Sequence, residues 1–133
     1  MKERRGFAPM LIIKDGIAAV KFYQEAFGAV ELKRYPNDDG TIHVSELAIE
    51  GNIFLIREEN AQRGHFDAGM INGTTVLIGI FVGDPYAVQQ QALNAGAVEI
   101  RAVKDHEETG YREGNVKDPF GHTWLILKKY MEQ

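Results

Sequence analysis

The chain lacks cysteine altogether, and its 133 residues include only one serine, one tryptophan and four prolines. Without cysteine there can be no disulfide, no thiolate nucleophile and no thiolate metal site. A cysteine-free chain is compatible with a reducing compartment, and we predict a cytoplasmic protein. The single serine, Ser45, has no visible orienting network or oxyanion hole, so the sequence does not indicate a serine nucleophile.

Long hydrophobic runs and an excess of positive charge are also missing. The apolar run at residues 7–13 is ended by Lys14 and Asp15, which makes it too short for a signal peptide. No run approaches the ~18 apolar residues that a membrane span needs. The formal net charge is −4, and lysine and arginine form no stripe along the chain. We therefore expect neither nucleic acid nor a membrane as a partner.

The chain repeats itself. Residues 28–32 read Gly-Ala-Val-Glu-Leu, and residues 96–100 read Gly-Ala-Val-Glu-Ile. Each segment follows an apolar run that ends at an aspartate, Asp15 in the first half and Asp84 in the second. We interpret this as one domain, residues 1–133, that contains an internal repeat of residues 7–58 and 75–129. The polar, glycine-bearing segment at about residues 59–74 is the expected linker, with the character of a surface flap.

Both copies predict the same order of elements. An apolar strand comes first, and the aspartate after it is suited to cap a helix. Val20, Tyr23 and Phe27 then recur at helical spacing, and Gly28 and Gly96 are suited to end the two helices. Three strands follow in each copy, at residues 29–35, 42–49 and 53–57, and at 97–103, 111–117 and 123–128. The predicted fold class is α+β, with two tandem βαβββ modules.

The segment from Gly110 to Trp124 carries the most specific motif, because it contains Asp-Pro-Phe-Gly-His at residues 118–122. Together with Phe22-Tyr23 and Ala26-Phe27-Gly28-Ala29, it resembles the vicinal-oxygen-chelate superfamily (glyoxalase, bleomycin-resistance and dioxygenase proteins), in its PhnB-like branch. The resemblance implies curved mixed sheets whose concave faces form a cleft, with the helices outside. It also implies a homodimer, often with modules paired across chains. It does not fix a reaction, since the superfamily hosts several chemistries and simple binders.

Metal-dependent members of this superfamily take ligands from the first and last strands of each module. The matching positions here are Ala8, Leu77 and Leu125, with the fourth at Leu55 or Arg57. None of these side chains can donate a lone pair to a metal ion. His43 and Glu46 lie three apart on a predicted strand, so they point to opposite faces. We therefore predict no metal and no cofactor.

Several side chains are candidates for binding or chemistry. Glu46 is either a carboxylate satisfied by an arginine such as Arg112, or a general base in the cleft. Arg112 is the first candidate to anchor an anionic or polar ligand, and Arg57 the second. The ring of His122 is expected to bind backbone within its own turn, and Trp124 is expected in the core. The remaining ligand-binding candidates are Tyr111, His106 and Phe81.

Three functions stay open from the sequence. We favour a metal-independent binder of a small organic molecule, held in a cleft between paired modules. The alternatives are a lyase, isomerase or dioxygenase that uses Glu46 with Arg112, and a regulatory module whose cleft is filled. An apolar, aromatic-lined groove at the dimer interface favours the binder. A deep cleft with Glu46 pointing inward favours the enzyme, and a collapsed cleft favours the regulatory module.

Overall fold

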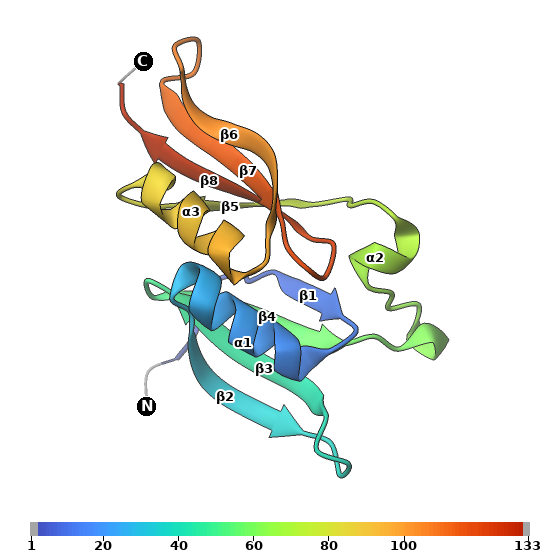
Figure 1. Ribbon diagram of the computed structural model, residues 1–133. Coiled ribbons are helices and arrows are strands. Elements are labelled where there is room, and N and C mark those ends of the chain that lie inside the picture. The colour runs from blue at the N-terminus through green and yellow to red at the C-terminus, as the bar shows by residue number, and fades with distance from the viewer. Residues whose placement is uncertain (1–2, 132–133) are drawn as a thin grey trace.

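The computed structural model describes residues 3–131 and folds them into two four-stranded sheets, each with one main helix (Figure 1). The first module contains β1 (Met10–Ile13), α1 (Gly16–Phe27), β2 (Val30–Pro36), β3 (Ile42–Ile49) and β4 (Asn52–Glu58). The second contains β5 (Leu77–Phe81), α3 (Pro85–Ala95), β6 (Val98–His106), β7 (Tyr111–Lys117) and β8 (Thr123–Lys129).

The two sheets have the same topology. Their strand orders are β1-β4-β3-β2 and β5-β8-β7-β6, and in each the first strand runs parallel to the last. The other neighbouring strands are antiparallel. The predicted α+β fold of two βαβββ modules is therefore confirmed.

The helix boundaries follow from the residues that flank them. The Asp15 carboxylate accepts a hydrogen bond from the Ala18 amide at 3.1 Å, and Asp84 does the same for Ala87 at 3.2 Å. Gly28 ends α1 with φ of 67°, a left-handed conformation that glycine adopts without strain. The first strand begins at Met10 rather than at residue 7, because Pro9 has no amide hydrogen to donate. The sixth strand runs three residues further than predicted, to His106.

The segment between the modules is more ordered than a plain polar linker. It contains a helical turn, η1 (Ala61–Arg63), and a short helix, α2 (Ala68–Ile71). The short helix packs on the turn before β8 at Gly121, whose φ is 94°. A Cβ atom at this position would lie 2.7 Å from the Gly69 amide nitrogen. Only glycine therefore allows this close approach.

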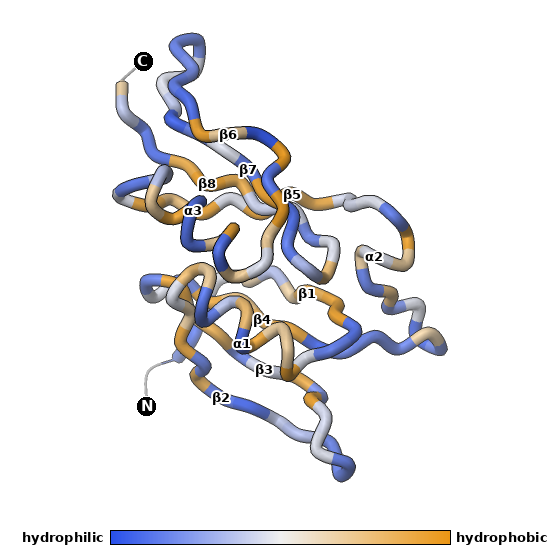
Figure 2. The backbone as a smooth tube through the Cα atoms, in the orientation of Figure 1, coloured by the Kyte–Doolittle hydropathy of each residue, from blue (hydrophilic) through white to orange (hydrophobic). Residues whose placement is uncertain are grey.

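The two modules share one hydrophobic core. Helix α1 packs against α3 (Figure 1), and buried side chains of both modules form a single cluster. Figure 2 shows hydrophobic residues on α1 and on the strands of both sheets. The Trp124 ring on β8 lies 5.4 Å from Tyr23 and 4.8 Å from Phe27, both on α1. Trp124 is 1% exposed, as predicted for a core residue. Separating the modules would expose these rings, so we expect them to fold as one unit.

A buried carboxylate, Asp118, joins the modules through hydrogen bonds. One of its oxygens accepts from the amides of Phe120 and His122, each at 2.9 Å. The other accepts from the Tyr23 hydroxyl at 2.5 Å and from the Trp124 indole at 2.9 Å. Burial, together with the Asp118 charge, raises the pKa of Tyr23 well above its ordinary value. The hydroxyl therefore keeps its proton and stays a donor to Asp118.

His122 makes a second polar contact between the modules. Its Nε2 lies 2.9 Å from the carbonyl oxygen of Ile12 in β1, and since a carbonyl only accepts, Nε2 carries the proton. The ring was expected to bind backbone in its own turn, and this expectation is wrong. It is the backbone amide of His122 that serves the turn, through Asp118. The ring instead reaches the first module.

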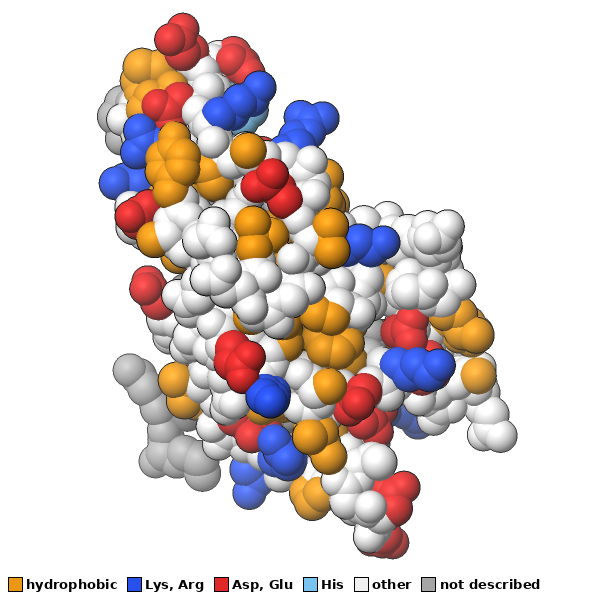
Figure 3. All heavy atoms as spheres, in the orientation of Figure 1, with side chains coloured by type: hydrophobic (Ala, Val, Ile, Leu, Met, Phe, Trp, Pro, Cys, Tyr) orange, Lys and Arg blue, Asp and Glu red, His pale blue; other side chains and the backbone are white. Residues whose placement is uncertain are grey.

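On the surface that carries α1 and α3, acidic and basic side chains are interspersed (Figure 3). Within residues 3–131, no helix has the length and apolar character needed to cross a membrane.

Replacing Tyr23 with phenylalanine should destabilise the fold. The change keeps the ring but removes one donor from a buried carboxylate, and hydrogen bonds to charged groups contribute about 1.5–3 kcal/mol. We expect a loss of that size in the free energy of unfolding, measured by urea denaturation. Tyr35→Phe is the control, because Tyr35 is 45% exposed. Equal stability of Tyr23→Phe and the wild type would contradict this role.

Candidate functional site

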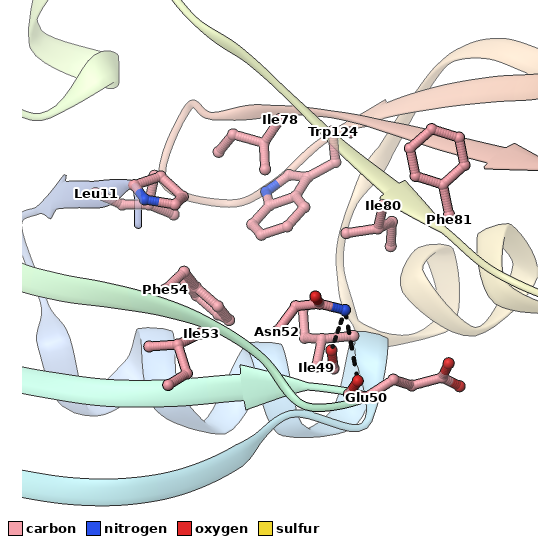
Figure 4. A pocket seen from close by; sticks show the side chains of 12 residues that line it. Leu11, Ile49, Glu50, Asn52, Ile53, Phe54, Ile78, Ile80, Phe81 and Trp124 are labelled. Carbon is pink, nitrogen blue, oxygen red and sulfur yellow. Dashed lines mark hydrogen bonds between the residues drawn. The ribbon is translucent and has the colours of Figure 1, made fainter. Parts of the chain in front are cut away.

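A cavity of about 270 Å³ lies between the two modules (Figure 4). Apolar side chains from both modules face each other across it, with Trp124 and Phe54 among them. The first module contributes Leu11, Ile49, Ile53 and Phe54, and the second contributes Ile78, Ile80, Phe81 and Trp124. A concave, mostly apolar site of this kind, at the boundary between two packed units, is typical of small-molecule binding sites.

Polar side chains at the cavity are few. The Asn52 amide donates to the carbonyl oxygens of Ile49 and Glu50, at 3.3 and 3.4 Å, within the β3–β4 turn. The indole nitrogen of Trp124 donates to Asp118. Among the described residues that line the cavity, Glu50 is the only charged one. The cavity can therefore exclude water from an apolar molecule, and its one carboxylate, Glu50, is exposed in the turn between β3 and β4.

Phe81, Tyr111 and His106 are brought together at one end of the second sheet. Phe81 lies at the cavity with 65% of its surface exposed, and its ring centre is 6.2 Å from that of Tyr111. His106 is the partner of Tyr111 in the β6–β7 register. Of these three candidates only Phe81 lines the cavity. The other two extend the aromatic surface away from it.

Arg112 lies on the opposite side of the second sheet, towards α3. Its guanidinium donates to both carboxylate oxygens of Asp105, at 2.7 and 3.2 Å, across the β6–β7 pair. The rings of Tyr86 on α3 and of Tyr130 lie 5.6 and 5.4 Å from it. This hydrogen bonding lowers the pKa of Asp105 and raises that of Arg112. The residue favoured as a ligand anchor is thus held in an ion pair and does not face the cavity.

Glu46 forms an ion pair, but not with the expected arginine. Its carboxylate lies 3.3 Å from Arg4 of the N-terminal segment, and its side chain is 18% exposed. Glu46 and Arg57 both project from the first sheet on the side away from α1, by the register of β3 and β4. Glu46 and Arg112 therefore belong to different sheets, and the structure does not bring them together. Arg57 is partly buried and lies outside the cavity lining.

The positions where relatives hold a metal do not form a metal site here. Ala8, Leu55, Leu77 and Leu125 offer only carbon, and His43 is exposed on β3. Within residues 3–131 no three histidine, aspartate or glutamate side chains gather closely enough to hold a metal ion. The residues present do not fit the divalent ion that the superfamily implies.

Sequence reasoning missed most of the cavity. Leu11, Ile49, Phe54 and Ile80 have the pattern of ordinary core residues, facing the helices of their own modules. What makes them line a cavity is the angle at which the modules meet, and no local pattern encodes that angle. Phe81 was the one lining residue among the predicted ligand-binding candidates, and it is the last residue of β5.

The sequence matches the family model of the Glyoxalase/Bleomycin resistance protein/Dioxygenase superfamily over residues 8–126. An uncharacterized protein of Mycobacterium bovis is 38% identical over 122 residues, which cover 90% of this chain and 80% of that protein. The match does not separate the branches of the superfamily, so the PhnB-like assignment stays a prediction.

Solved structures show the same fold. A gene product of Arabidopsis thaliana superposes with a TM-score of 0.73 and 29% identity, covering 93% of this chain and 98% of that one. The protein TioX from Micromonospora sp. ML1 also gives a TM-score of 0.73, with 23% identity and coverage of 97% and 99%. From the family match and the curated relatives, this chain belongs to the glyoxalase/bleomycin resistance protein/dioxygenase superfamily.

Proposed function

We propose that the protein binds a small, mainly apolar organic molecule without a metal, in the cavity between its modules. The observation that carries this proposal is the cavity itself, with Phe54, Phe81 and Trp124 among its walls. Aromatic side chains offer large rigid contact areas to such a ligand. A cysteine-free chain is consistent with a cytoplasmic location for this function.

The enzyme alternative has less support. A lyase or isomerase would need an acid or base within hydrogen-bond reach of the bound molecule. Glu46 is paired with Arg4 outside the cavity, and Arg112 is paired with Asp105 on the helix side of the other sheet. The regulatory alternative requires a collapsed cleft, whereas the cavity is open enough to admit a ligand. The arrangement therefore favours binding over either alternative.

The binding proposal can be tested with the neutral dye N-phenyl-1-naphthylamine. Trp124 is the only tryptophan of the chain and lines the cavity, so a dye bound there should accept energy from its fluorescence. We expect Phe81→Glu, which puts a charge at the cavity rim, to weaken dye binding about tenfold or more. This estimate follows from the loss of about 1.5–3 kcal/mol of apolar contact.

Ile17→Glu is the matched control for this experiment. Ile17 lies on α1, is 50% exposed, and belongs neither to the cavity lining nor to the proposed dimer faces. Its dye affinity should equal that of the wild type. If the wild type fails to bind the dye, or if both variants weaken binding equally, the cavity is not the site. A native mass spectrum of the purified protein would then identify any molecule bound elsewhere.

We also propose that the protein is a homodimer. Met10, Leu77 and Phe81 are large apolar side chains that project, exposed, from the sheet sides facing away from the helices. The edge strands β2 and β6 also carry exposed apolar residues, among them Val30 and Val98. Exposed apolar faces and open sheet edges are commonly covered by a second copy about a two-fold axis.

Light scattering at micromolar concentration should therefore report about twice the chain mass of 14.9 kDa. Leu77→Glu places a charge in the proposed interface and should shift the equilibrium towards the monomer. A wild type that remains monomeric at 100-fold higher concentration would contradict the proposal.

Removing metal ions should change neither folding nor binding. The ligand positions are filled by Ala8, Leu55, Leu77 and Leu125, so no metal binding energy is available to stabilise the fold. We expect the melting temperature and dye affinity to be the same before and after treatment with a chelator. Elemental analysis should find well below one zinc, nickel, manganese or iron per chain. A stoichiometric metal whose removal lowers the melting temperature would overturn the metal-free proposal.

A further inference from the structure

Arg57 stands apart from the cavity, on the side of the first sheet that faces away from α1. It lies on β4, where the strand register places Ile12 of β1 on one side of it and Val44 of β3 on the other. Both neighbours are partly buried, and so is Arg57 itself. The Arg57 side chain therefore starts between two apolar neighbours, and its Nε is shielded from water. We call this side of the first sheet its open face.

The guanidinium of Arg57 has no acceptor within the described chain. Its Nε is shielded from water and makes no hydrogen bond. Residues 3–131 also provide no carboxylate within 4.0 Å of its nitrogens, whereas Arg4, Arg34 and Arg112 each have one. A buried donor left unsatisfied costs free energy, more so when it is charged. Such an arginine is suited to receive an acceptor that the chain itself does not supply.

The charges around Arg57 favour an anion. Lys33 on β2 is the register partner of Glu46 and lies over the Tyr35 ring at 5.5 Å, on the same open face. Glu46 is already engaged by Arg4, so its charge is offset. The positive charges of Arg57 and Lys33 remain, although the chain as a whole has a net charge of −4. The open face is thus locally positive on an acidic protein.

We propose that Arg57 binds the carboxylate of a small organic acid. The two terminal nitrogens of a guanidinium match the two oxygens of a carboxylate, and a rotation of the side chain lets Nε donate as well. Ile12 and Val44 flank the ligand with apolar surface, and Lys33 adds a second positive charge. This site goes beyond the proposed function, because Arg57 is not among the residues that line the cavity.

The test uses benzoate and its uncharged analogue benzamide as probes. The Nε–Hε signals of arginines in nitrogen-15 NMR spectra report directly on the group in question. We expect benzoate to shift the Arg57 signal at millimolar concentration, and benzamide to bind at least tenfold more weakly. Arg57→Gln should abolish the preference for benzoate. Arg57→Lys should retain part of it, since the charge stays but the planar fork is lost.

Arg63→Gln is the matched control, because Arg63 is an exposed arginine in the turn η1. It should leave the preference for benzoate unchanged. Equal binding of benzoate and benzamide, or an unchanged preference in Arg57→Gln, would overturn the proposal. It would also be overturned if Arg57→Gln only converted a dimer into a monomer, since the acceptor would then belong to a second copy. Binding of the neutral dye in the cavity is a separate measurement, so either site can fail alone.

Discussion

The structure depends on one buried negative charge, the Asp118 carboxylate, and on the requirement that all its acceptor positions be filled. Two donors come from its own turn and two from aromatic side chains, one of which, Tyr23, belongs to the other module. A buried carboxylate that lacked donors would destabilise the fold, so the Tyr23 hydroxyl has to lie within hydrogen-bond distance of Asp118. This explains in physical terms the Asp-Pro-Phe-Gly-His motif at residues 118–122. The aspartate organises the turn and fixes where α1 can lie, while Gly121 leaves room for α2.

Trp124 connects the buried Asp118 carboxylate to the candidate site. Its indole nitrogen is bound to Asp118, and its ring forms part of the cavity wall (Figure 4). The interaction that sets the position of the two modules therefore also sets the shape of the space between them. Because the ring contacts Tyr23, Phe27 and Phe54, it cannot move into the cavity without breaking the shared core. The cavity is thus preformed, and a ligand need not order its walls on binding.

Local structure could be predicted from the sequence, and the partners of polar side chains could not. The caps Asp15 and Asp84 and the limits of β3 and β7 were correct, because they depend on neighbouring residues. The sequence suggested an ion pair between Glu46 and Arg112, but the two residues lie in different sheets. Arg112 forms its ion pair with Asp105, its register partner across β6–β7. Glu46 forms its ion pair with Arg4, in the distant N-terminal segment. Sequence alone also could not place the His122 ring against Ile12, because that contact depends on how the modules meet.

The duplicated modules share a topology but differ in chemistry at matching positions. Glu46 is paired in register with Leu55 in the first sheet, and Asn115 holds the same place beside Leu125 in the second. Two residues further along the last strand of each sheet, the first sheet carries Arg57 where the second carries Leu127. At this second position the first sheet thus pairs Arg57 with Val44, whereas the second sheet pairs Leu127 with the carboxylate of Glu113. A duplicated fold needs both copies for its shared core, but the outward-facing positions are free of that constraint. The charge at this matching pair is therefore positive in the first module and negative in the second, so the two faces need not serve the same ligand groups.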